Sequence, residues 1–324
     1  MTNRRIFIRS FTSGLLVSQV TAFGQPAPRV SRIGILGNTD AAAWNAFRQG
    51  MRDLGYVDGR NIAMEWRWAN GSAARYPELA TELVQLKVDL IVTSSTQATL
   101  AAKQATRAIP IVMFNSAYPD KIGLVESLAH PGGNVTGFSN VTTELTGKRL
   151  ELLREISPRV TRLALLWNPD SPIEVIGHRE SVATAAAVGV EIQSIEVRSP
   201  TEHAAAFEAV IASRANALHV NGNPVNFKNF QQIIDFALGS RLPSSFEERT
   251  FVEAGGLFSY ASSFADTYRR GAAYVDKILR GEKPGDLPIQ QPTRFEFVIN
   301  LKTARALGLA VPRALQLRAD ETIQ

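Results

Sequence analysis

The chain resembles itself across its two halves, and this internal repeat is the feature that most restricts its fold. The segment 29–38, Arg-Val-Ser-Arg-Ile-Gly-Ile-Leu-Gly-Asn, aligns with the segment 159–168, Arg-Val-Thr-Arg-Leu-Ala-Leu-Leu-Trp-Asn, with five identities in ten at an offset of 130. Further matches follow at offsets of 134, 128 and 133, namely Gly55 with Gly189, Leu90 with Leu218, and Ile109-Pro110 with Leu242-Pro243. Each half is therefore predicted to contain the same series of elements.

Both halves alternate strands with helices. Each repeat begins with a basic residue and a short apolar run that ends in polar residues, which is typical of a buried strand. A helix that ends at a glycine comes next, followed by a second buried strand. This alternation indicates βαβ units and a parallel sheet in each half. Because 324 residues suit two lobes of ordinary domain size, the sequence predicts an α/β fold of two doubly wound parallel-sheet lobes joined by a three-strand hinge.

The limits of the lobes follow from turn clusters and from the order of the elements. A turn cluster at 130–134 is expected to end the first pass through the N-terminal lobe. A strand around 257–260 is expected to complete that lobe's sheet before the helix 265–279, and a third crossing follows 281–288. The predicted division is 29–138 plus about 258–286 for the N-terminal lobe and 139–257 plus about 287–324 for the C-terminal lobe, with hinge strands near 137–141, 257–260 and 287–290.

The first 24 residues have the layout of a signal peptide. They contain Arg4, Arg5 and Arg9 and no acidic residue, then a mildly apolar run at 11–22 and a small-residue exit at Gly24. The two adjacent arginines and the weak hydrophobicity resemble a twin-arginine export signal, with ordinary Sec export as the alternative. A disordered basic tail or an amphipathic first helix is the non-functional interpretation. We expect export to the periplasm with cleavage near Gly24.

Composition excludes several classes of function. Beyond the N-terminus no apolar run approaches the ~18 residues that a membrane helix needs. Removing the three leader arginines leaves 32 basic and 30 acidic residues with no basic cluster, so no nucleic-acid partner is expected. The chain has no cysteine, which excludes disulfides, thiol catalysis, Cys-ligated metal and a lipid anchor on a cysteine. We expect a monomer.

Polar residues follow the buried strands of both halves. In open parallel sheets, ligands bind outside the carboxyl ends of the strands, so these residues are the candidate ligand-binding set. Ser94–Thr96 stands at the start of a helix, where hydroxyls and free N–H groups can hold a carboxylate. The alternative is a plain N-cap for a helix 97–106. The set comprises Asn38, Ser94, Ser95, Thr96, Gln97, Asn115, Ser116, Asn168, Asn221, Asn223, Phe246 and Glu247.

Several segments carry a resemblance to a known family. They are 55–62 leading to 65–69, Pro131-Gly-Gly-Asn-Val-Thr-Gly137, Glu144 with 148–153, 254–257 and 291–304. Together they resemble the periplasmic solute-binding proteins of ABC transporters that include tryptophan and tyrosine binders. The resemblance implies a type I periplasmic-binding-protein fold, a small-molecule ligand in the cleft and an ABC permease in the inner membrane as a transient partner.

The same resemblance implies where the binding loops lie, and one of them departs from the family. The implied loops are 94–97, 115–118, Asn168, 221–223 and 246–247. Many members have Asp-Pro where this chain has Tyr118-Pro119. If that Asp meets a ligand's ammonium, Glu247 can take over the ammonium, and Tyr118 can stack on a ring or donate a hydrogen bond.

The chain shows no reactive constellation. Its four histidines lack metal-ligand spacing, and there is no GxGxxG motif, P-loop or GxSxG elbow. Glu247 and Glu248 are neighbours on an expected strand, so alternation predicts one inward and one in solvent. We therefore expect no metal, no cofactor and no enzyme. The alternatives are a ligand-sensing receptor of the same fold or a periplasmic enzyme.

Overall fold

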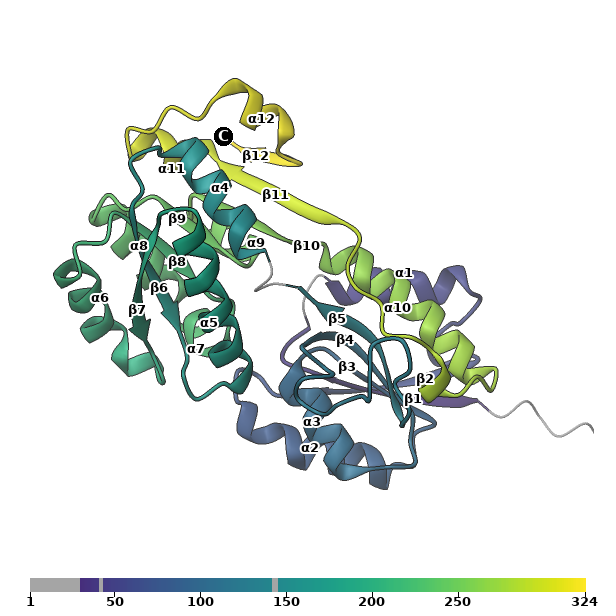
Figure 1. The fold of residues 1–324 in the computed structure, drawn as a ribbon. Coiled ribbons are helices and arrows are strands. Elements are labelled where there is room, and N and C mark those ends of the chain that lie inside the picture. Colours follow the sequence, from purple (N-terminus) through teal and green to yellow (C-terminus); the bar gives the residue numbers. More distant parts are fainter. Residues whose placement is uncertain (1–29, 41–42, 142–144) are drawn as a thin grey trace, which may run out of the picture.

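The computed structural model describes residues 30–40, 43–141 and 145–324, which form two α/β lobes (Figure 1). The expected signal peptide at 1–24 and Glu144 lie outside the described residues. In the described part of the chain, no helix combines the length and the apolar composition needed to cross a membrane. The predicted pair of parallel-sheet lobes is confirmed.

The first lobe is a five-stranded parallel sheet in the order β2-β1-β3-β4-β5. Along β1, Ile33 and Ile35 face one helix layer and Leu36 faces the other, so both faces of the sheet are buried. One layer is α1 with α10, and the opposite layer is α2 with α3. The elements are β1 (Ser31–Gly37), α1 (Ala43–Asp53), β2 (Ile62–Trp68), η1 (Ala73–Arg75), α2 (Tyr76–Gln85), β3 (Leu90–Thr93), α3 (Thr96–Ala105), β4 (Ile111–Ala117), β5 (Val135–Asn140) and α10 (Phe264–Leu279).

The second lobe is a seven-stranded sheet in the order β12-β11-β10-β9-β8-β6-β7, in which only the β10–β11 pairing is antiparallel. Helices cover both faces here too. The elements are α4 (Thr146–Ile156), β6 (Arg162–Trp167), α5 (Pro172–Ala187), β7 (Glu191–Glu196), η2 (Pro200–Glu202), α6 (His203–Ala212), β8 (Ala217–Val220), α7 (Pro224–Lys228), α8 (Phe230–Gly239), β9 (Ser244–Phe246), α9 (Arg249–Glu253), β10 (Phe258–Ser262), β11 (Phe295–Asn300), α11 (Leu301–Ala306), α12 (Arg313–Arg318) and β12 (Glu321–Ile323).

The internal repeat has a structural counterpart. The order β2-β1-β3-β4 in the first sheet corresponds to β7-β6-β8-β9 in the second. The repeated glycines also match, since Gly55 and Gly189 follow α1 and α5 with φ of +88° and +72°, a backbone conformation that glycine adopts readily.

Three connections join the lobes side by side (Figure 1). Gln290 N–H donates to the Gly137 carbonyl at 2.9 Å, and Ser139 N–H donates to the Gln290 carbonyl at 2.9 Å. On the other side of the third connection, Ser263 N–H donates to the Arg294 carbonyl at 2.9 Å. Backbone hydrogen bonds therefore tie each connection to a neighbour.

One expected strand belongs to the other lobe. The strand around 257–260 was predicted to complete the first sheet, and this is wrong because β10 pairs with β9 and β11 in the second sheet. The chain returns to the first lobe only after Ser262, and α10 then packs on α1. Gly50 makes this close packing possible, since a Cβ there would lie 2.7 Å from the Arg269 carbonyl oxygen.

Candidate functional site

A cleft lies between the lobes at the carboxyl ends of the strands. The first lobe lines it with Asn38, Tyr76, Ser95, Thr96, Gln97, Asn115, Ala117, Asn140 and Phe264, and the second with Ser171, Ile173, Glu174, Asn221, Gly222, Asn223, Pro224, Phe227, Glu247 and Glu248. Of the residues expected from the sequence, the structure gathers Asn38, Ser95, Thr96, Gln97, Asn115, Asn221, Asn223 and Glu247 here. Ser94, Ser116, Tyr118, Asn168 and Phe246 lie outside the lining.

On the first-lobe side the cleft is bounded by the N-terminus of α3. Ser95 caps the helix, with an extended backbone and its Oγ accepting from Ala98 N–H at 3.2 Å. The Thr96 Oγ1 accepts from Ala117 N–H at 3.1 Å and from the Ser116 hydroxyl at 3.3 Å. The hydroxyls therefore have structural partners, while the N–H groups of Thr96 and Gln97, at the first two helical positions, have no partner within the helix. These N–H groups are suited to an anion.

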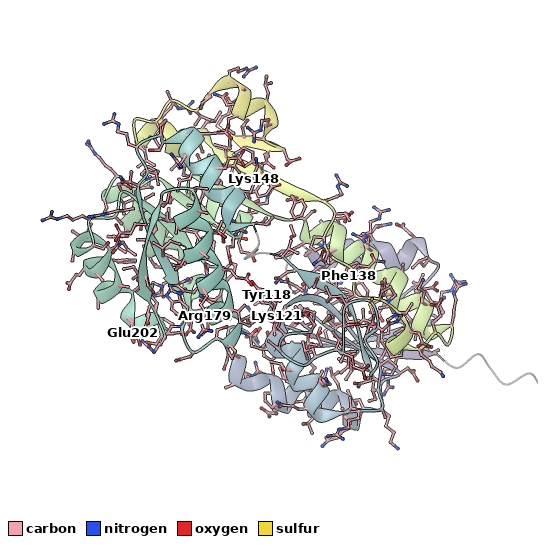
Figure 2. All side chains as sticks on the ribbon, in the orientation of Figure 1. Tyr118, Lys121, Phe138, Lys148, Arg179 and Glu202 are labelled. Atoms are coloured by element: carbon pink, nitrogen blue, oxygen red, sulfur yellow. The ribbon has the colours of Figure 1, made fainter. Side chains whose placement is uncertain are left out.

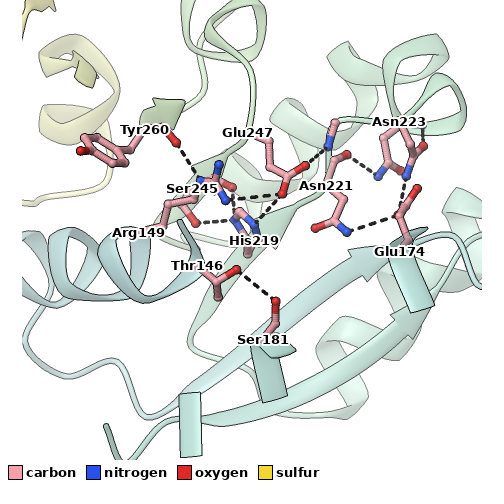
Figure 3. Close-up of polar contacts among 12 residues, drawn as sticks. Thr146, Arg149, Glu174, Ser181, His219, Asn221, Asn223, Ser245, Glu247 and Tyr260 are labelled. Carbon is pink, nitrogen blue, oxygen red and sulfur yellow. Dashed lines mark hydrogen bonds and ion pairs between the residues drawn. The ribbon is translucent and has the colours of Figure 1, made fainter. Parts of the chain in front are cut away.

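On the second-lobe side one carboxylate organises three backbone and amide donors. The Glu174 Oε2 accepts from Asn168 N–H at 2.8 Å. It also accepts from Asn223 Nδ2 at 3.1 Å and from Asn221 Nδ2 at 3.3 Å (Figure 3). Burial raises the pKa of Glu174 to about 7 despite these donors. Asn168 thus supports the wall from behind, and the two lining asparagines are held in fixed orientations.

A second carboxylate is part of a buried charge cluster. The Glu247 Oε2 accepts from Gly222 N–H at 2.8 Å, and its Oε1 lies 3.4 Å from Arg149 Nη1 and 3.9 Å from His219 Nε2 (Figure 3). Burial alone would raise the pKa of Glu247, but nearby His219 and the charge of Arg149 outweigh it and hold the pKa below its usual value. Burial lowers the pKa of His219, so its ring is neutral at pH 7. His219 Nδ1 lies 2.8 Å from Ser245 Oγ.

The neighbouring carboxylate, Glu248, also lines the cleft. Glu247 is buried and Glu248 is half-buried at the cleft, so the two differ in exposure in the sense predicted, although both lie past Phe246, where β9 ends. Burial, reinforced by the negative charge of Glu247, raises the pKa of Glu248 to about 8, and Arg149 opposes the rise.

Two expected site residues are part of the interior instead. Phe246 is fully buried and stacks on Phe251 at 5.0 Å between ring centroids, because its side chain faces the helix layer. Ser116 is fully buried against Thr96. Ser94 follows the last residue of β3 and lies beside Tyr268 of α10.

Tyr118 connects the lobes and does not face the cleft. Its hydroxyl donates to the Glu180 Oε2 on α5, and Lys121 Nζ contacts the Glu180 Oε1 at 3.0 Å. The Lys121 Nζ also lies 4.4 Å from the centroid of the Tyr118 ring. Both residues lie where the lobes face each other (Figure 2). We call Tyr118, Lys121 and Glu180 the interlobe clasp.

Sequence reasoning missed the aromatic part of the lining. The aromatic residues Tyr76, Phe227 and Phe264 lie in the first turns of α2, α7 and α10, and Ile173 lies in the first turn of α5. The first helical turn after each loop would have been the signal, since it faces the same edge of the sheet as the strand ends. Arg149 lies on the buried face of α4, and in the sequence it stands out only as part of the family-like segment 148–153.

Comparison with known proteins identifies relatives over almost the whole described chain. The model of a family described as ABC transporter substrate binding protein matches residues 31–323. A tyrosine-binding protein of Clostridioides difficile (strain R20291) is 26% identical over 282 residues, covering 86% of this chain and 81% of the relative.

Solved structures agree with this similarity. A conserved domain protein from Vibrio cholerae O1 superposes with a TM-score of 0.84 at 26% identity, covering 91% of this chain and 100% of that one. An ABC domain from Streptococcus pneumoniae in complex with L-Trp gives a TM-score of 0.83 at 25% identity, with the same coverage of 91% and 100%.

Proposed function

Because this chain belongs to the family of ABC transporter substrate-binding proteins, we propose that it is the periplasmic solute-binding component of an importer and takes an aromatic α-amino acid in the interlobe cleft. The observation that carries the proposal is that the two sides of the cleft differ in charge preference: one suits an anion and the other a cation. The N-terminus of α3 on the first lobe faces the carboxylate-lined wall of the second. An α-amino acid carries one group for each wall, a carboxylate and an ammonium.

The aromatic lining supports an aromatic side chain on the ligand. Tyr76, Phe227 and Phe264 line the cleft together with Ile173 and Pro224. Rings of this kind contribute both apolar area and favourable edge or stacking contacts. The relatives that bind tyrosine or carry L-Trp are consistent with this choice.

The tyrosine in place of the family's common Asp does not remove the negative charge from the cleft. The carboxyl groups of Glu174, Glu247 and Glu248 line the cleft from the opposite lobe and can become negatively charged when a cation binds. The Tyr118 hydroxyl donates to Glu180 in the interlobe clasp. We therefore do not assign Tyr118 the ligand-binding role expected for the Asp that many family members have at this position.

Delivery to a permease requires export. The paired arginines Arg4 and Arg5 followed by a weakly apolar run support the twin-arginine route, with removal of the leader near Gly24. The released protein then closes on its ligand by hinge bending and presents it to an ABC permease. The ligand is recovered unchanged, as for a binder and unlike an enzyme.

A thermal-shift and calorimetric panel on the mature protein tests this function. L-Tryptophan, L-tyrosine and L-phenylalanine are compared with L-leucine, indole-3-propionate and a hexose. At about 100 times the Kd, binding adds about 2.7 kcal/mol to the free energy of unfolding, which raises Tm by roughly 5–10 °C for a lobe of this size. The aromatic amino acids should give this rise. A shift with the hexose and none with any amino acid would refute the proposal.

A further inference from the structure

The cleft wall of the second lobe is rich in carboxylates and poor in cations. Glu174, Glu247 and Glu248 line it, and none of the described lining residues is a lysine or an arginine. Arg149 lies behind the wall, fully buried beside Glu247. A ligand that brings a positive group therefore meets three carboxylates, which raises the question of which one receives it.

Glu247 is already engaged. One oxygen accepts from Gly222 N–H at 2.8 Å, and the other lies 3.4 Å from Arg149 Nη1, within a side chain that is 8% exposed. The charge of Glu247 is balanced by the buried guanidinium of Arg149, and breaking a buried ion pair is costly because it leaves one charge without a partner. An ammonium at Glu247 would have to compete with Arg149.

Glu248 is not engaged. Among the described residues, its carboxylate has neither a hydrogen-bond partner nor an ion pair, although the side chain lines the cleft. Its position depends on Gly222, since a Cβ at residue 222 would lie 2.9 Å from Glu248 Cγ and 3.3 Å from its Oε1. The one glycine thus donates its N–H to Glu247 and leaves room for the side chain of Glu248 on the cleft side.

The charges around Glu248 favour its neutral form while the cleft is empty. Burial and the charge of Glu247 raise its pKa to about 8, and Arg149 on α4 offsets them in part. From the first lobe, α10 presents Tyr268, a buried phenol whose own pKa is raised by burial and by Glu248. An ammonium placed beside this carboxyl group favours its ionised form.

We propose that Glu248, and not Glu247, receives the ammonium of the ligand, and that Glu248 gives up its proton to solvent as the ligand binds. The carboxyl group and the ligand ammonium become a carboxylate–ammonium pair and one released proton. Glu247 is a positioning residue, which holds Gly222 and Arg149 in place. The inference rests on the proposed function, because it requires a zwitterionic ligand in the cleft.

Calorimetry with L-tryptophan tests the assignment. Glu248→Gln should weaken binding about 10- to 100-fold, the range for a hydrogen bond to a charged group, while indole-3-propionate, which lacks the ammonium, should bind both proteins equally. Glu208→Gln on the exposed face of α6 is the matched charge control and should bind like the wild type.

Proton release gives a readout that a purely structural role would not produce. Titrations at pH 7 in phosphate and in Tris should report release of about one proton per tryptophan by the wild type, since most of a group with a pKa of about 8 is protonated there. The release should disappear in Glu248→Gln. Release that persists in Glu248→Gln and disappears in Glu174→Gln would place the titrating group at Glu174 and overturn the proposal.

Stability of the empty protein separates a folding defect from a binding defect. A carboxyl group whose pKa is raised from 4.5 to about 8 on folding costs stability progressively as pH rises from 4.5 to 8. Glu248→Gln should therefore raise Tm at pH 8 as it weakens binding. Wild-type protein that binds neither tryptophan nor tyrosine refutes the proposed function. Wild-type binding that Glu248→Gln leaves intact refutes this inference alone.

Discussion

We expect the strength of ligand binding to depend on the interlobe clasp, whose residues lie outside the cleft. Tyr118→Phe removes the hydroxyl that donates to Glu180, and Lys121→Gln removes the ion pair of 3.0 Å together with the cation over the Tyr118 ring. Both contacts join residues of different lobes, so under the proposed hinge closure they form only in the closed state. Removing either should shift the equilibrium toward the open form without touching the ligand.

The magnitude follows from the exposure of the clasp. A hydrogen bond to a charged group is worth about 1.5–3 kcal/mol, but the Glu180 side chain is 38% exposed, so we take about 1 kcal/mol after competition from water. That is about fivefold in an equilibrium constant. The exposed ion pair of Lys121 contributes less, about 0.5 kcal/mol or twofold. If the open form predominates without ligand, the apparent Kd rises by the same factors.

Calorimetry with L-tryptophan measures these factors directly. Tyr118→Phe should weaken binding about fivefold, and Glu180→Gln about tenfold because it also removes the ion pair with Lys121. The double variant should bind no more weakly than Glu180→Gln, because the Tyr118 contact is already lost there. The hydrogen bonds from Tyr118 and Lys121 hold the pKa of Glu180 below its ordinary 4.5 even though burial acts to raise it. The carboxylate of Glu180 is therefore ionised at neutral pH and the clasp is intact. The clasp is lost only as pH falls through the lowered pKa of Glu180, below 4.5. Unchanged affinity in Tyr118→Phe would refute the reasoning.

Three further predictions concern the cap, the glycine and export. Thr96→Val removes the acceptor of a buried N–H at Ala117 and should cost about 1–3 kcal/mol in urea unfolding; an unchanged midpoint would contradict it. Gly222→Ala should push the Glu248 side chain out of place, since the new Cβ would lie 2.9 Å from its Cγ. Overpacking of this kind costs about 1–3 kcal/mol, and we expect tryptophan binding to weaken roughly tenfold; full affinity would contradict this. Arg4→Lys with Arg5→Lys should leave uncleaved protein in the cytoplasm, whereas normal export of that variant would indicate the Sec route.

The buried parallel strands were predictable because they depend on a local pattern that occurs twice. Apolar runs with polar exits, such as 33–38 and 163–168, identify buried parallel strands wherever they occur. The sheet to which β10 belongs was not predictable, since it depends on pairing with β9 and β11 across long stretches of chain. Sequence order alone could not distinguish a strand before a crossing from one after it.

The candidate site was predictable at the level of loops and less so at the level of side chains. Strand ends point to one edge of a sheet, which is why Ser95 and Asn221 reach the cleft. In the three-residue strand β9 the pattern is too short to show which side of the sheet a residue faces, so Phe246 was assigned to the wrong side. Which of the adjacent residues Glu247 and Glu248 forms an ion pair depends on Arg149. This arginine is distant in sequence, and only folding brings it near Glu247.

A crystal structure of the mature protein with L-tryptophan tests the central claim most directly. The account predicts one tryptophan between the lobes, with its carboxylate on the N–H groups of Thr96 and Gln97 and its ammonium within hydrogen-bond distance of Glu248. The indole should lie among Tyr76, Phe227 and Phe264. A tryptophan bound outside the cleft, or an empty cleft at saturating tryptophan, would contradict the account.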